Sequence, residues 1–517
     1  MTEGDSDPPR SDLARSDLAR SMVTVAVMMA TTVVILDMTI ASIALPHMQG
    51  SLGASQDQIG WVMTTYFVCQ AISTACTGWV AGRLGRKRTF LLALAGFMGF
   101  SVLSGSATSL PEILVWRACQ GAMSAPVIPI SQALMLDNYP PERHGSALAI
   151  WGTGVMFAPV MGPVVGGFVT ENYGWQWIFF IGIPFALAGL ALGLAFMRET
   201  LAKQDRPFDL FGFVALACAL AALQLLLDRG EQEGWFDSPE IVIEAAVVLL
   251  GLYVFTVHSL TTDNPFVSRG ILSDRNFVLG LAFMFLLGVC VLALNVILPM
   301  FLQVLRGLPV ITAGYVMAPR GLGTFASLLL AGWLVRHVDG RLVCALGFAC
   351  VAVSSYYLST FSADVDLYDV SWAAFVNGLG IGFIWVPLTV ISFETLPVRH
   401  RTEASTLTSL ARNYGSGVGV SVVVAILSRT RAVSQGEISA RVDPYREGAQ
   451  APYLPEAWDP ASPPGIAALD GEIFRQAQAI GFANDFHAIA IAALATIPLI
   501  ALLRTAGPPR RRRRASA

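Results

Sequence analysis

Charged side chains are scarce in this chain of 517 residues. They account for 13% of the residues, whereas 54% are hydrophobic; soluble domains average roughly a quarter charged residues. Lysine is nearly absent, since Lys87 and Lys203 are the only two. Neither lies in a phosphate-cradling GxxxxGK[ST] loop, so the sequence excludes an ATP-driven pump of the P-loop type. This shortage of charge points to a surface that faces lipid.

Signatures of enzymes and metal sites are missing too. There is no HExxH and no GxSxG motif, and the six histidines are scattered along the chain. The seven cysteines all lie in apolar segments, and an odd number in that setting favours free thiols over disulfides or metal ligands. We therefore expect no enzymatic activity, no metal site and no cofactor.

Long apolar segments are abundant instead. A helix needs about 20 mostly apolar residues to cross the hydrocarbon core of a bilayer. The segments that qualify are 22–45, 58–81, 89–108, 111–136, 144–170, 175–197, 209–228, 240–260, 276–302, 312–335, 341–361, 370–393, 403–430 and 484–504. The fourth contains Arg117 and the thirteenth contains Arg412. The sequence thus predicts an all-α polytopic membrane protein with fourteen transmembrane helices.

Basic residues are distributed unevenly between the two sides of this predicted bundle. Fourteen spans put both termini on one side, which then holds 23 of the 33 basic residues, against seven on the other side and three within spans. Because Lys and Arg are enriched in cytoplasmic loops, we expect both termini in the cytoplasm. The first twenty residues are polar and do not resemble a cleavable signal peptide. The run Arg510–Arg514 is expected to rest against anionic headgroups.

One long polar segment, 431–484, falls on the opposite side. Its Pro-rich middle, Tyr453–Pro464, predicts a loop. Leu469–Phe482 has two interpretations, a short amphipathic helix on the membrane face or plain extracellular loop.

Asp37 is the one charged residue in the first apolar segment. A carboxylate there costs about 3 kcal/mol on insertion scales, so such groups usually mark a substrate or proton path. The alternative is a packing role, with the carboxylate satisfied by backbone or hydroxyl groups. At a rise of 1.5 Å per residue, Asp37 and Arg117 differ in depth by only about 3 Å.

The two side chains therefore lie at similar depths in the membrane, which allows them to form a pair. A nearby cation favours the ionised carboxylate and apolar surroundings favour the neutral form, so moving Asp37 toward and away from Arg117 would release and take up a proton. A structural ion pair is the alternative role of Arg117.

The fifth apolar segment combines proline with small residues. Pro159 and Pro163 lie four residues apart, and each removes a backbone donor, which favours a kink. Gly162 and Gly166 form a GxxxG face that lets a neighbouring helix approach closely. Two interpretations are open, a bent hinge or seal between domains and close packing without special motion.

Four short segments carry motifs. Leu36–Pro46 reads LDMTIASIALP, Gly78–Arg88 reads GWVAGRLGRKR, Arg117–Gly121 reads RACQG and Ala158–Gly167 reads APVMGPVVGG. They resemble, in turn, the LDxTIxNxALP signature, the cytoplasmic loop motif, the RxxQG proton-coupling motif and the antiporter motif of the major facilitator superfamily, in its fourteen-helix drug:proton antiporter branch (EmrB/QacA type). Further likenesses lie at Trp175–Pro184, Leu298–Gln303, Pro319–Gly321 and Arg412–Gly415.

This resemblance implies a major facilitator fold, with two six-helix bundles and a two-helix insertion. The expected parts are a cytoplasmic tail (1–21), a first bundle (22–199), the insertion (200–262), a second bundle (263–505, including the 431–484 loop) and a basic cytoplasmic tail (506–517). A second Gly-Trp loop, Gly332–Arg341, stands in the second bundle where Gly78–Arg88 stands in the first.

The function implied is proton-coupled multidrug efflux, which carries amphipathic or aromatic small molecules across a bacterial inner membrane by alternating access. The implied partners are the substrate, protons and the bilayer, with a periplasmic membrane-fusion adaptor in a Gram-negative cell and no nucleic acid.

The resemblance also assigns roles to residues. Proton coupling falls to Asp37 and Arg117. Gating falls to Gly78, Gly85, Arg86, Lys87, Pro159, Gly162, Pro163, Gly166 and Gly167. The substrate cavity is expected to include Trp61, Tyr66, Gln70, Gln120, Gln132, Arg320 and Arg412. Glu394 and Glu403, near cytoplasmic helix ends, are expected to be solvated.

Gly82 departs from the family pattern. The loop motif normally has an acidic residue there, which pairs with a nearby Arg and a helix end to lock the cytoplasmic gate. Its absence leaves the four loop cations, Arg83, Arg86, Lys87 and Arg88, without that partner, and Asp137 or Glu142 are the acids that would serve instead. Ordinary positive-inside topology is the alternative role of the loop cations.

Two other transport functions stay open. The runner-up is a proton-coupled exporter of one dedicated metabolite or siderophore, and a nutrient importer comes third. Sequence does not separate them, because substrate range depends on the shape of the cavity. A membrane scaffold would not require Asp37 and Arg117 inside the membrane.

Overall fold

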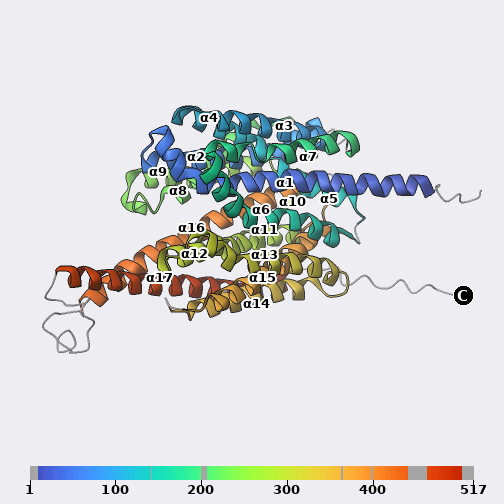
Figure 1. Cartoon of the computed structure of the whole chain (residues 1–517). Helices are drawn as coiled ribbons and strands as arrows, with labels where there is room; N and C mark the ends of the chain where they lie inside the picture. Colours follow the sequence, from blue (N-terminus) through green and yellow to red (C-terminus); the bar gives the residue numbers. More distant parts are fainter. Residues whose placement is uncertain are drawn as a thin grey trace, which may run out of the picture.

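The computed structural model describes residues 10–140, 143–199, 207–362, 365–397, 400–440 and 463–503, and every regular element in these ranges is helical. In chain order the elements are α1 (Arg10–Leu52), α2 (Gln56–Leu84), α3 (Arg86–Gly105), α4 (Leu110–Ser124), α5 (Val127–Asn138), α6 (His144–Tyr173), η2 (Trp175–Phe179), α7 (Ile183–Phe196), α8 (Leu210–Arg229), η3 (Trp235–Asp237), α9 (Pro239–Thr261), α10 (Arg269–Leu272), α11 (Arg275–Leu287), η4 (Gly288–Leu292), α12 (Leu294–Met300), η5 (Phe301–Leu305), α13 (Val310–Leu334), α14 (Gly340–Ser359), α15 (Leu367–Glu394), α16 (Arg401–Ser439), α17 (Pro463–Leu499) and η8 (Ile500–Leu502). The long helices run side by side (Figure 1).

Twelve stretches of helix in the described residues are long and apolar enough to cross a bilayer. α6 and α13, with 30 and 25 residues, have the length to cross as well. Each of the fourteen segments predicted from the sequence is thus helical, in the predicted order. The prediction of an all-α polytopic fold is confirmed.

Short polar side chains set where several helices begin. Ser55 accepts a hydrogen bond from the Gln58 backbone, and the Gln58 side chain accepts one from the Ser55 backbone, which forms a capping box on α2. Asp209, Asp274 and Asp366 cap α8, α11 and α15. These caps satisfy N–H groups that a helix start leaves without partners.

Two of the predicted spans are interrupted helices. The fourth span divides into α4 and α5 at Ala125 and Pro126, because proline lacks the backbone N–H that continues a helix. The ninth span combines α11 and α12 with two π-helical turns, η4 before and η5 directly after α12, which contains Pro299. Such π turns inside α-helices frequently accompany function.

The bounds of the loop predicted at 431–484 need correction, because residues 431–439 belong to α16 and residues 463–484 belong to α17. Of the two interpretations of Leu469–Phe482, the structure supports the helical one, since this stretch is part of the 37-residue helix α17. Ile473, Ala477 and Phe482 are buried, so an apolar stripe at helical spacing extends beyond the apolar span. A hydropathy average misses this extension because polar residues share the same window. Residues 441–462, like Glu142 and Arg510–Arg514, lie outside the described part of the chain.

The helices form two groups that face each other (Figure 1). In the first group α1 packs against α6 and α7, and α2 packs against α4. In the second group α15 packs against α13 and α14, and α17 packs against α14 and α16. The pair α8 and α9 lies at the edge, where α8 contacts both α2 and α16. We call these sets the first group (α1–α7) and the second group (α11–α17).

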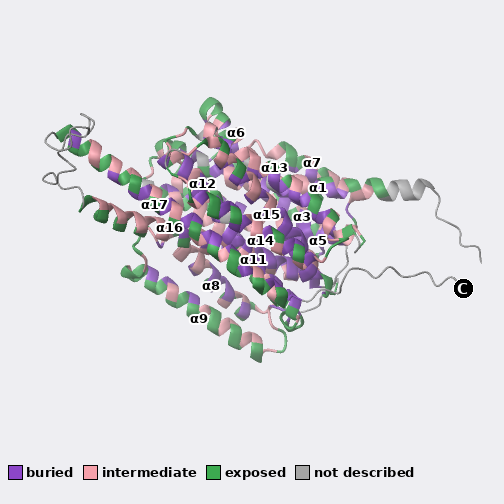
Figure 2. Ribbon diagram, turned by 90° about the horizontal axis from the view of Figure 1, so that it is seen from below, coloured by how far each residue is buried: buried purple, intermediate pink, exposed green. Residues whose placement is uncertain are grey.

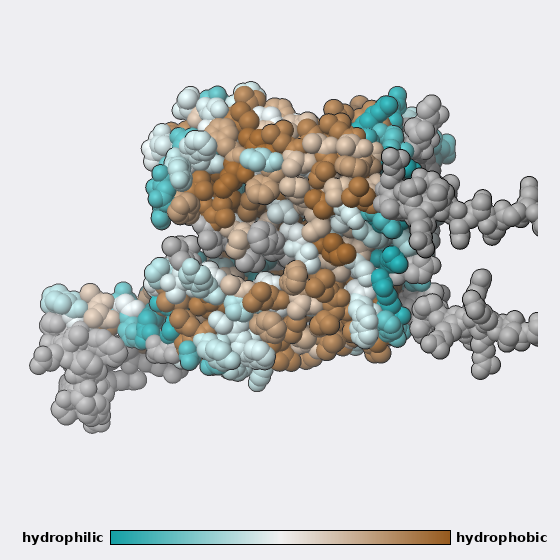
Figure 3. Space-filling model, turned by 45° about the vertical axis from the view of Figure 1, so that its right-hand side comes forward, coloured by the Kyte–Doolittle hydropathy of each residue, from teal (hydrophilic) through white to brown (hydrophobic). Residues whose placement is uncertain are grey.

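The two ends of the molecule differ. At the termini end, α1 begins and η8 ends; at the opposite end, α16 ends and α17 begins (Figure 1). The groups touch at the termini end, where α5 contacts α16 and α6 contacts α13. The space-filling view shows a hollow between the two lobes that opens at the opposite end (Figure 3). The structure is therefore open at one end and closed at the other.

The outer helices carry large apolar side chains on their surface. On α9, Leu249, Tyr253 and Leu260 are 71%, 67% and 70% exposed, and most of this helix is exposed (Figure 2). Apolar patches of this extent are rare on soluble proteins. Together with the twelve membrane-length helices, they indicate that these surfaces contact lipid.

Candidate functional site

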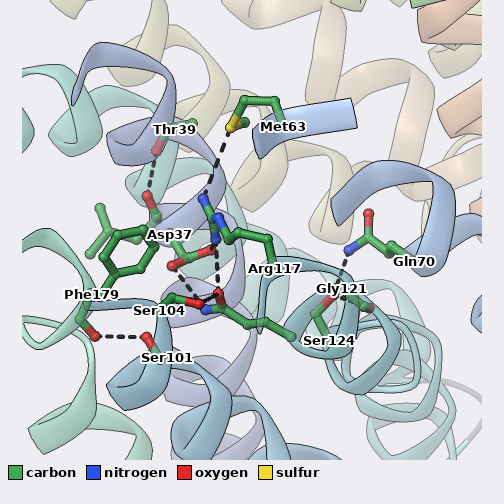
Figure 4. A network of polar contacts seen from close by, with 12 residues as sticks. Asp37, Thr39, Met63, Gln70, Ser101, Ser104, Arg117, Gly121, Ser124 and Phe179 are labelled. Atoms are coloured by element: carbon green, nitrogen blue, oxygen red, sulfur yellow. Dashed lines mark hydrogen bonds and ion pairs between the residues drawn. The ribbon is translucent and has the colours of Figure 1, made fainter. Parts of the chain in front are cut away.

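A buried polar network surrounds Asp37 on α1 (Figure 4). Its Oδ2 accepts a hydrogen bond from Arg117 Nη1 at 2.7 Å, and its Oδ1 accepts one from Gln120 Nε2 at 3.1 Å. Asp37 is 8% exposed, and the other two side chains are fully buried. Asp37 and Arg117 are thus paired directly, by the short geometry typical of charge-assisted hydrogen bonds.

Arg117, on α4, is held from several sides. Its guanidinium lies 5.0 Å from the centroid of the Tyr66 ring and 4.8 Å from that of the Phe179 ring, which adds cation–π attraction. Nη1 also donates to Gln120 Oε1 at 2.9 Å. Ser101 in turn donates to the backbone carbonyl of Phe179 at 2.7 Å, which anchors that ring (Figure 4).

The side chains around the network are largely apolar. The small pocket that Asp37 lines has Val33, Ile40, Phe97 and Phe179 among its other walls. Water screens such buried charges poorly, and leaving one partner of a buried pair unpaired costs about 3–5 kcal/mol. The pairing of Asp37 with Arg117 therefore stabilises both buried side chains in this conformation.

Three residues predicted to line the substrate cavity are buried in or beside this network and do not line the hollow between the groups. Tyr66, Gln70 and Gln120 are all buried. Gln70 donates to Ser124 at 2.9 Å, which ties α2 to α4 (Figure 4). A Cβ on Gly121 would lie 2.2 Å from the backbone oxygen of Tyr66, so this close approach of α2 and α4 requires glycine.

The other predicted cavity residues are spread over both groups. Trp61 is 36% exposed, and its ring lies 5.3 Å from the guanidinium of Arg229 on α8. Arg320 is buried and donates to the Asn295 side chain and, at 3.0 Å, to a backbone carbonyl, so its partners are neutral. Arg412 is half-buried and forms no ion pair within the described residues. The structure does not bring these three residues together with Asp37.

Asp137 on α5 joins the two groups at the termini end. It pairs with Arg86 of the first group and with Arg401 of the second, the latter at 3.3 Å. Beside it, the hydroxyl of Ser405 on α16 bonds to Gln132 at 2.7 Å. Gln132, predicted for the cavity, thus belongs to this closed end. We call these five residues the termini-end gate.

Two of the loop cations have acidic partners despite Gly82. Arg86 pairs with Asp137, one of the two acids expected to serve in place of the motif acid, and Arg88 lies 3.6 Å from Glu199. The Lys87 backbone donates to Glu199 at 3.2 Å, whereas its ammonium donates to the backbone carbonyl of Leu194 at 3.0 Å. Gly85 has φ +91°, and a Cβ there would lie 2.1 Å from Glu199, so only glycine fits.

Glu403, expected to be solvated, is bonded instead. Its carboxylate accepts hydrogen bonds from the backbone N–H of Ser268, at 2.5 Å, and from the Ser268 hydroxyl, at 2.9 Å. A Cβ on Gly78 would lie 3.2 Å from the Glu403 Cα, so the predicted gating glycine lets α2 approach α16. Glu394 is exposed, as expected.

Helix α6 carries the predicted small-residue face. A Cβ on Gly162 would lie 2.2 Å from Thr39 Oγ1, and one on Gly166 would lie 3.0 Å from Ile40, so this face packs on α1 just beyond Asp37. Gly167 faces open space and takes no part in that contact. Pro159 and Pro163 also lie in α6; their side chains are outside the described set.

Sequence reasoning missed Arg401 and Ser405 of the gate, which look like an ordinary basic helix start. It also missed Asp485 in α17, which is fully buried. The signal for Asp485 was present, because this carboxylate falls inside the last predicted span, 484–504, just as Asp37 falls inside the first.

Comparisons with known proteins agree with this architecture. Residues 27–420 match the family described as Major Facilitator Superfamily. The chain is 35% identical to Multidrug export protein EmrB of Haemophilus influenzae over 439 residues, which cover 84% of this chain and 85% of that protein. It is 36% identical to Fatty acid resistance protein FarB of Neisseria gonorrhoeae over 431 residues, covering 82% of this chain and 84% of the relative.

Solved structures share the fold. The proton:xylose symporter XylE matches with a TM-score of 0.60 at 14% identity, covering 94% of this chain and 96% of the symporter. The human organic anion transporter MFSD10 matches with a TM-score of 0.58 at 12% identity, covering 94% of this chain and 100% of that chain.

Proposed function

Because the chain belongs to the Major Facilitator Superfamily, we propose that it is a proton-coupled multidrug exporter. It carries amphipathic or aromatic small molecules out across a bacterial inner membrane by alternating access. Relatives that are named for multidrug export and cover most of the chain support this assignment.

The buried network of Asp37, Arg117 and Gln120 is the observation that carries the proposal. In this conformation Arg117 pairs with Asp37 at 2.7 Å and neutralises its charge. A movement that separates Asp37 from Arg117 lets it bind a proton, and re-forming the pair expels that proton. Pairing and conformation are thereby linked, as coupled transport requires.

Alternating access fits the contrast between the two ends. The hollow opens at the opposite end, while Asp137, Arg401, Gln132 and Ser405 join the groups at the termini end. In the alternate state this gate separates and the opposite end closes. The α6 face, packed on α1 through Gly162 beside Asp37, would transmit the movement to the network.

The parts keep their predicted boundaries in this proposal. Residues 22–199 and 263–505 are the two bundles, residues 200–262 are the insertion, and both termini are cytoplasmic. A reporter fused after Ala517 and one inserted near Gly448 should report opposite sides of the membrane. Equal signals would contradict the fourteen-span topology. In a Gram-negative cell a periplasmic adaptor would be the further partner.

A narrower alternative is an exporter dedicated to one amphipathic anion. The relative named for fatty acid resistance supports it. So does the second group, where Arg320 has neutral partners and Arg412 forms no ion pair in the described residues. Both cations would attract a carboxylate more than a cationic drug.

Transport by purified protein tests these proposals. In proteoliposomes loaded with an amphipathic dye, an imposed pH gradient should drive dye movement, and ATP should have no effect. ATP-dependent movement without a gradient would overturn proton coupling. A drug-susceptibility panel that includes long-chain fatty acids, with and without expression, separates broad efflux from the dedicated alternative.

A further inference from the structure

Asp485 is a second carboxylate within the membrane-length helices. It lies on α17, fourteen residues before the end at Leu499, or about 21 Å along the helix axis. That distance places it inside a hydrocarbon core about 30 Å thick. Its side chain is fully buried, and within the described part of the chain neither carboxylate oxygen has a hydrogen-bond partner.

The surroundings of Asp485 are apolar. On the same helix, Phe482 and Phe486 pack against the ring of Phe301 at 5.7 and 5.9 Å. One turn earlier, Gly481 packs against Leu427 of α16. The contacts around this part of α17 thus involve hydrocarbon side chains.

Among the described residues, no titratable group bonds to this carboxylate. The titratable side chains on the elements packed against α17 are Arg341, Cys344, Cys350, Tyr356 and Tyr357 of α14, Cys290 of η4, and Arg401, Glu403, Arg412, Tyr414, Arg429, Arg431 and Glu437 of α16. His487 of α17 itself lies 6.0 Å from the Tyr356 ring. The turn η5 and helix α12 contain no titratable residue.

An ionised carboxylate without partners in such surroundings is very costly, so the group takes up a proton and becomes neutral. Asp37 differs, because Arg117 and Gln120 both donate to it. The two membrane carboxylates therefore differ in their surroundings: Asp37 accepts from two donors, and Asp485 accepts from none in the described part of the chain.

We propose that Asp485 is a second proton-binding site of this transporter, occupied in the conformation that is open at the opposite end. This inference rests on the proposed proton-coupled function. Binding forms one O–H bond on a carboxylate oxygen with a proton from water, and release breaks that bond and returns the proton to water. The π-helical turns η4 and η5, both packed on α17, are the elements whose rearrangement would admit water.

If two sites each exchange a proton in every transport cycle, two protons move for each substrate molecule, whereas a single site would move one. At zero membrane potential, a tenfold proton gradient sustains about a hundredfold substrate gradient with two protons per substrate, and about a tenfold gradient with one. Asp485→Asn keeps the size of the side chain and cannot exchange a proton. Asp470→Asn, an exposed position on the same helix, is the matched control.

Infrared spectroscopy of the wild-type protein labelled with ¹³C-aspartate tests the protonation directly. A carboxylic-acid C=O band should be present near neutral pH, be absent from Asp485→Asn and remain in Asp470→Asn. It should weaken when an inward-facing state is trapped. Absence of the band, or a band unchanged in both states, would overturn the proposal. This readout is independent of any transport.

Substrate gradients in proteoliposomes test the coupling. Asp485→Asn should still respond to a pH gradient through Asp37, but its limiting substrate gradient should fall to about the square root of the wild-type value. Asp485→Leu serves as a second variant if the amide impairs folding. An unchanged limit in a folded variant would make Asp485 a structural acid. A wild-type protein that ignores the pH gradient would defeat the proposed function instead, and the infrared result would still stand.

Discussion

The two helix groups handle membrane-embedded charge in opposite ways. In the first, Asp37 and Arg117 neutralise each other at 2.7 Å. In the second, Asp485 has no hydrogen-bond partner among the residues that the structure describes, and the cation Arg320 bonds to neutral oxygens. The comparison teaches that two groups of similar helices can surround a buried carboxylate with quite different partners.

Asp37→Asn should have the largest effect. The amide preserves the shape of the network but cannot exchange a proton, so active transport should fall to near background while the protein still inserts. Asp17→Asn is the control on the same helix, because the Asp17 side chain is 72% exposed. Dye export against a gradient measures both. Wild-type export by Asp37→Asn would make the carboxylate structural and remove the contrast between the groups.

Replacing the two buried cations sharpens the comparison. Arg117→Met leaves Asp37 buried and unpaired, which should destabilise the protein by about 3–5 kcal/mol unless Asp37 becomes protonated. Arg320→Met leaves only neutral acceptors without a partner, at a cost of about 1–3 kcal/mol.

Thermal unfolding in detergent at pH 5 and pH 8 separates the two cases. The loss of melting temperature caused by Arg117→Met should be smaller at pH 5, because protonation of Asp37 removes the unpaired charge. The loss caused by Arg320→Met should be the same at both pH values. Equal pH responses would contradict the charge assignment.

Asp137→Asn tests the gate where the groups meet. Of its two ion pairs, only the one with Arg401 crosses between the groups. Weakening that pair by about 1 kcal/mol corresponds to roughly a fivefold population shift toward the state open at the termini end. Asp366→Asn is the control, because asparagine also caps a helix start. Spin-label distances across the termini end report the population. Unchanged distances would mean that the other contacts at this end, between α6 and α13 and between Ser405 and Gln132, are enough to keep it closed.

Gly162→Ala should disturb the α6–α1 contact. The new methyl would lie 2.2 Å from Thr39 Oγ1, so α1 must shift beside Asp37, at a cost of about 1–2 kcal/mol. Gly167→Ala meets nothing within 4 Å and is the control. Melting temperature and the pH dependence of export should change for the first variant alone. A change of the same size in both would point to backbone effects instead.

Gly82→Asp should have the smallest effect. The new acid would join a pocket that Arg86 and Glu403 already line, and Asp137 already holds Arg86. The free-energy difference between the conformations open and closed at the termini end should change by less than about 1 kcal/mol. A single thiol in the hollow of a cysteine-free background reports it, and labelling from the cytoplasm should be unchanged. Reduced labelling would show that Arg83 or Lys87 still needed the motif acid.

Patterns of neighbouring residues in the sequence were enough to predict the helices and the ion pair of Asp37 with Arg117. Lipid leaves a chain few alternatives to helices, so apolar segments located all fourteen predicted spans. Asp37 and Arg117 could be matched because depth follows directly from helix rise. The gate could not be found this way, since Asp137 and Arg401 are 264 positions apart and each sits in an ordinary-looking helix end.

By itself, the sequence determined the helical membrane fold, the order of its spans and the buried charges, because each depends on residues close together in the chain or on the solvent around them. Only the tertiary structure decided that Asp37 is paired and Asp485 is not, that acids from α5 and beyond α7 replace the acid missing at Gly82, and that one end is closed. Partnership between side chains depends on how helices distant in sequence pack, and hydropathy carries no information about that packing.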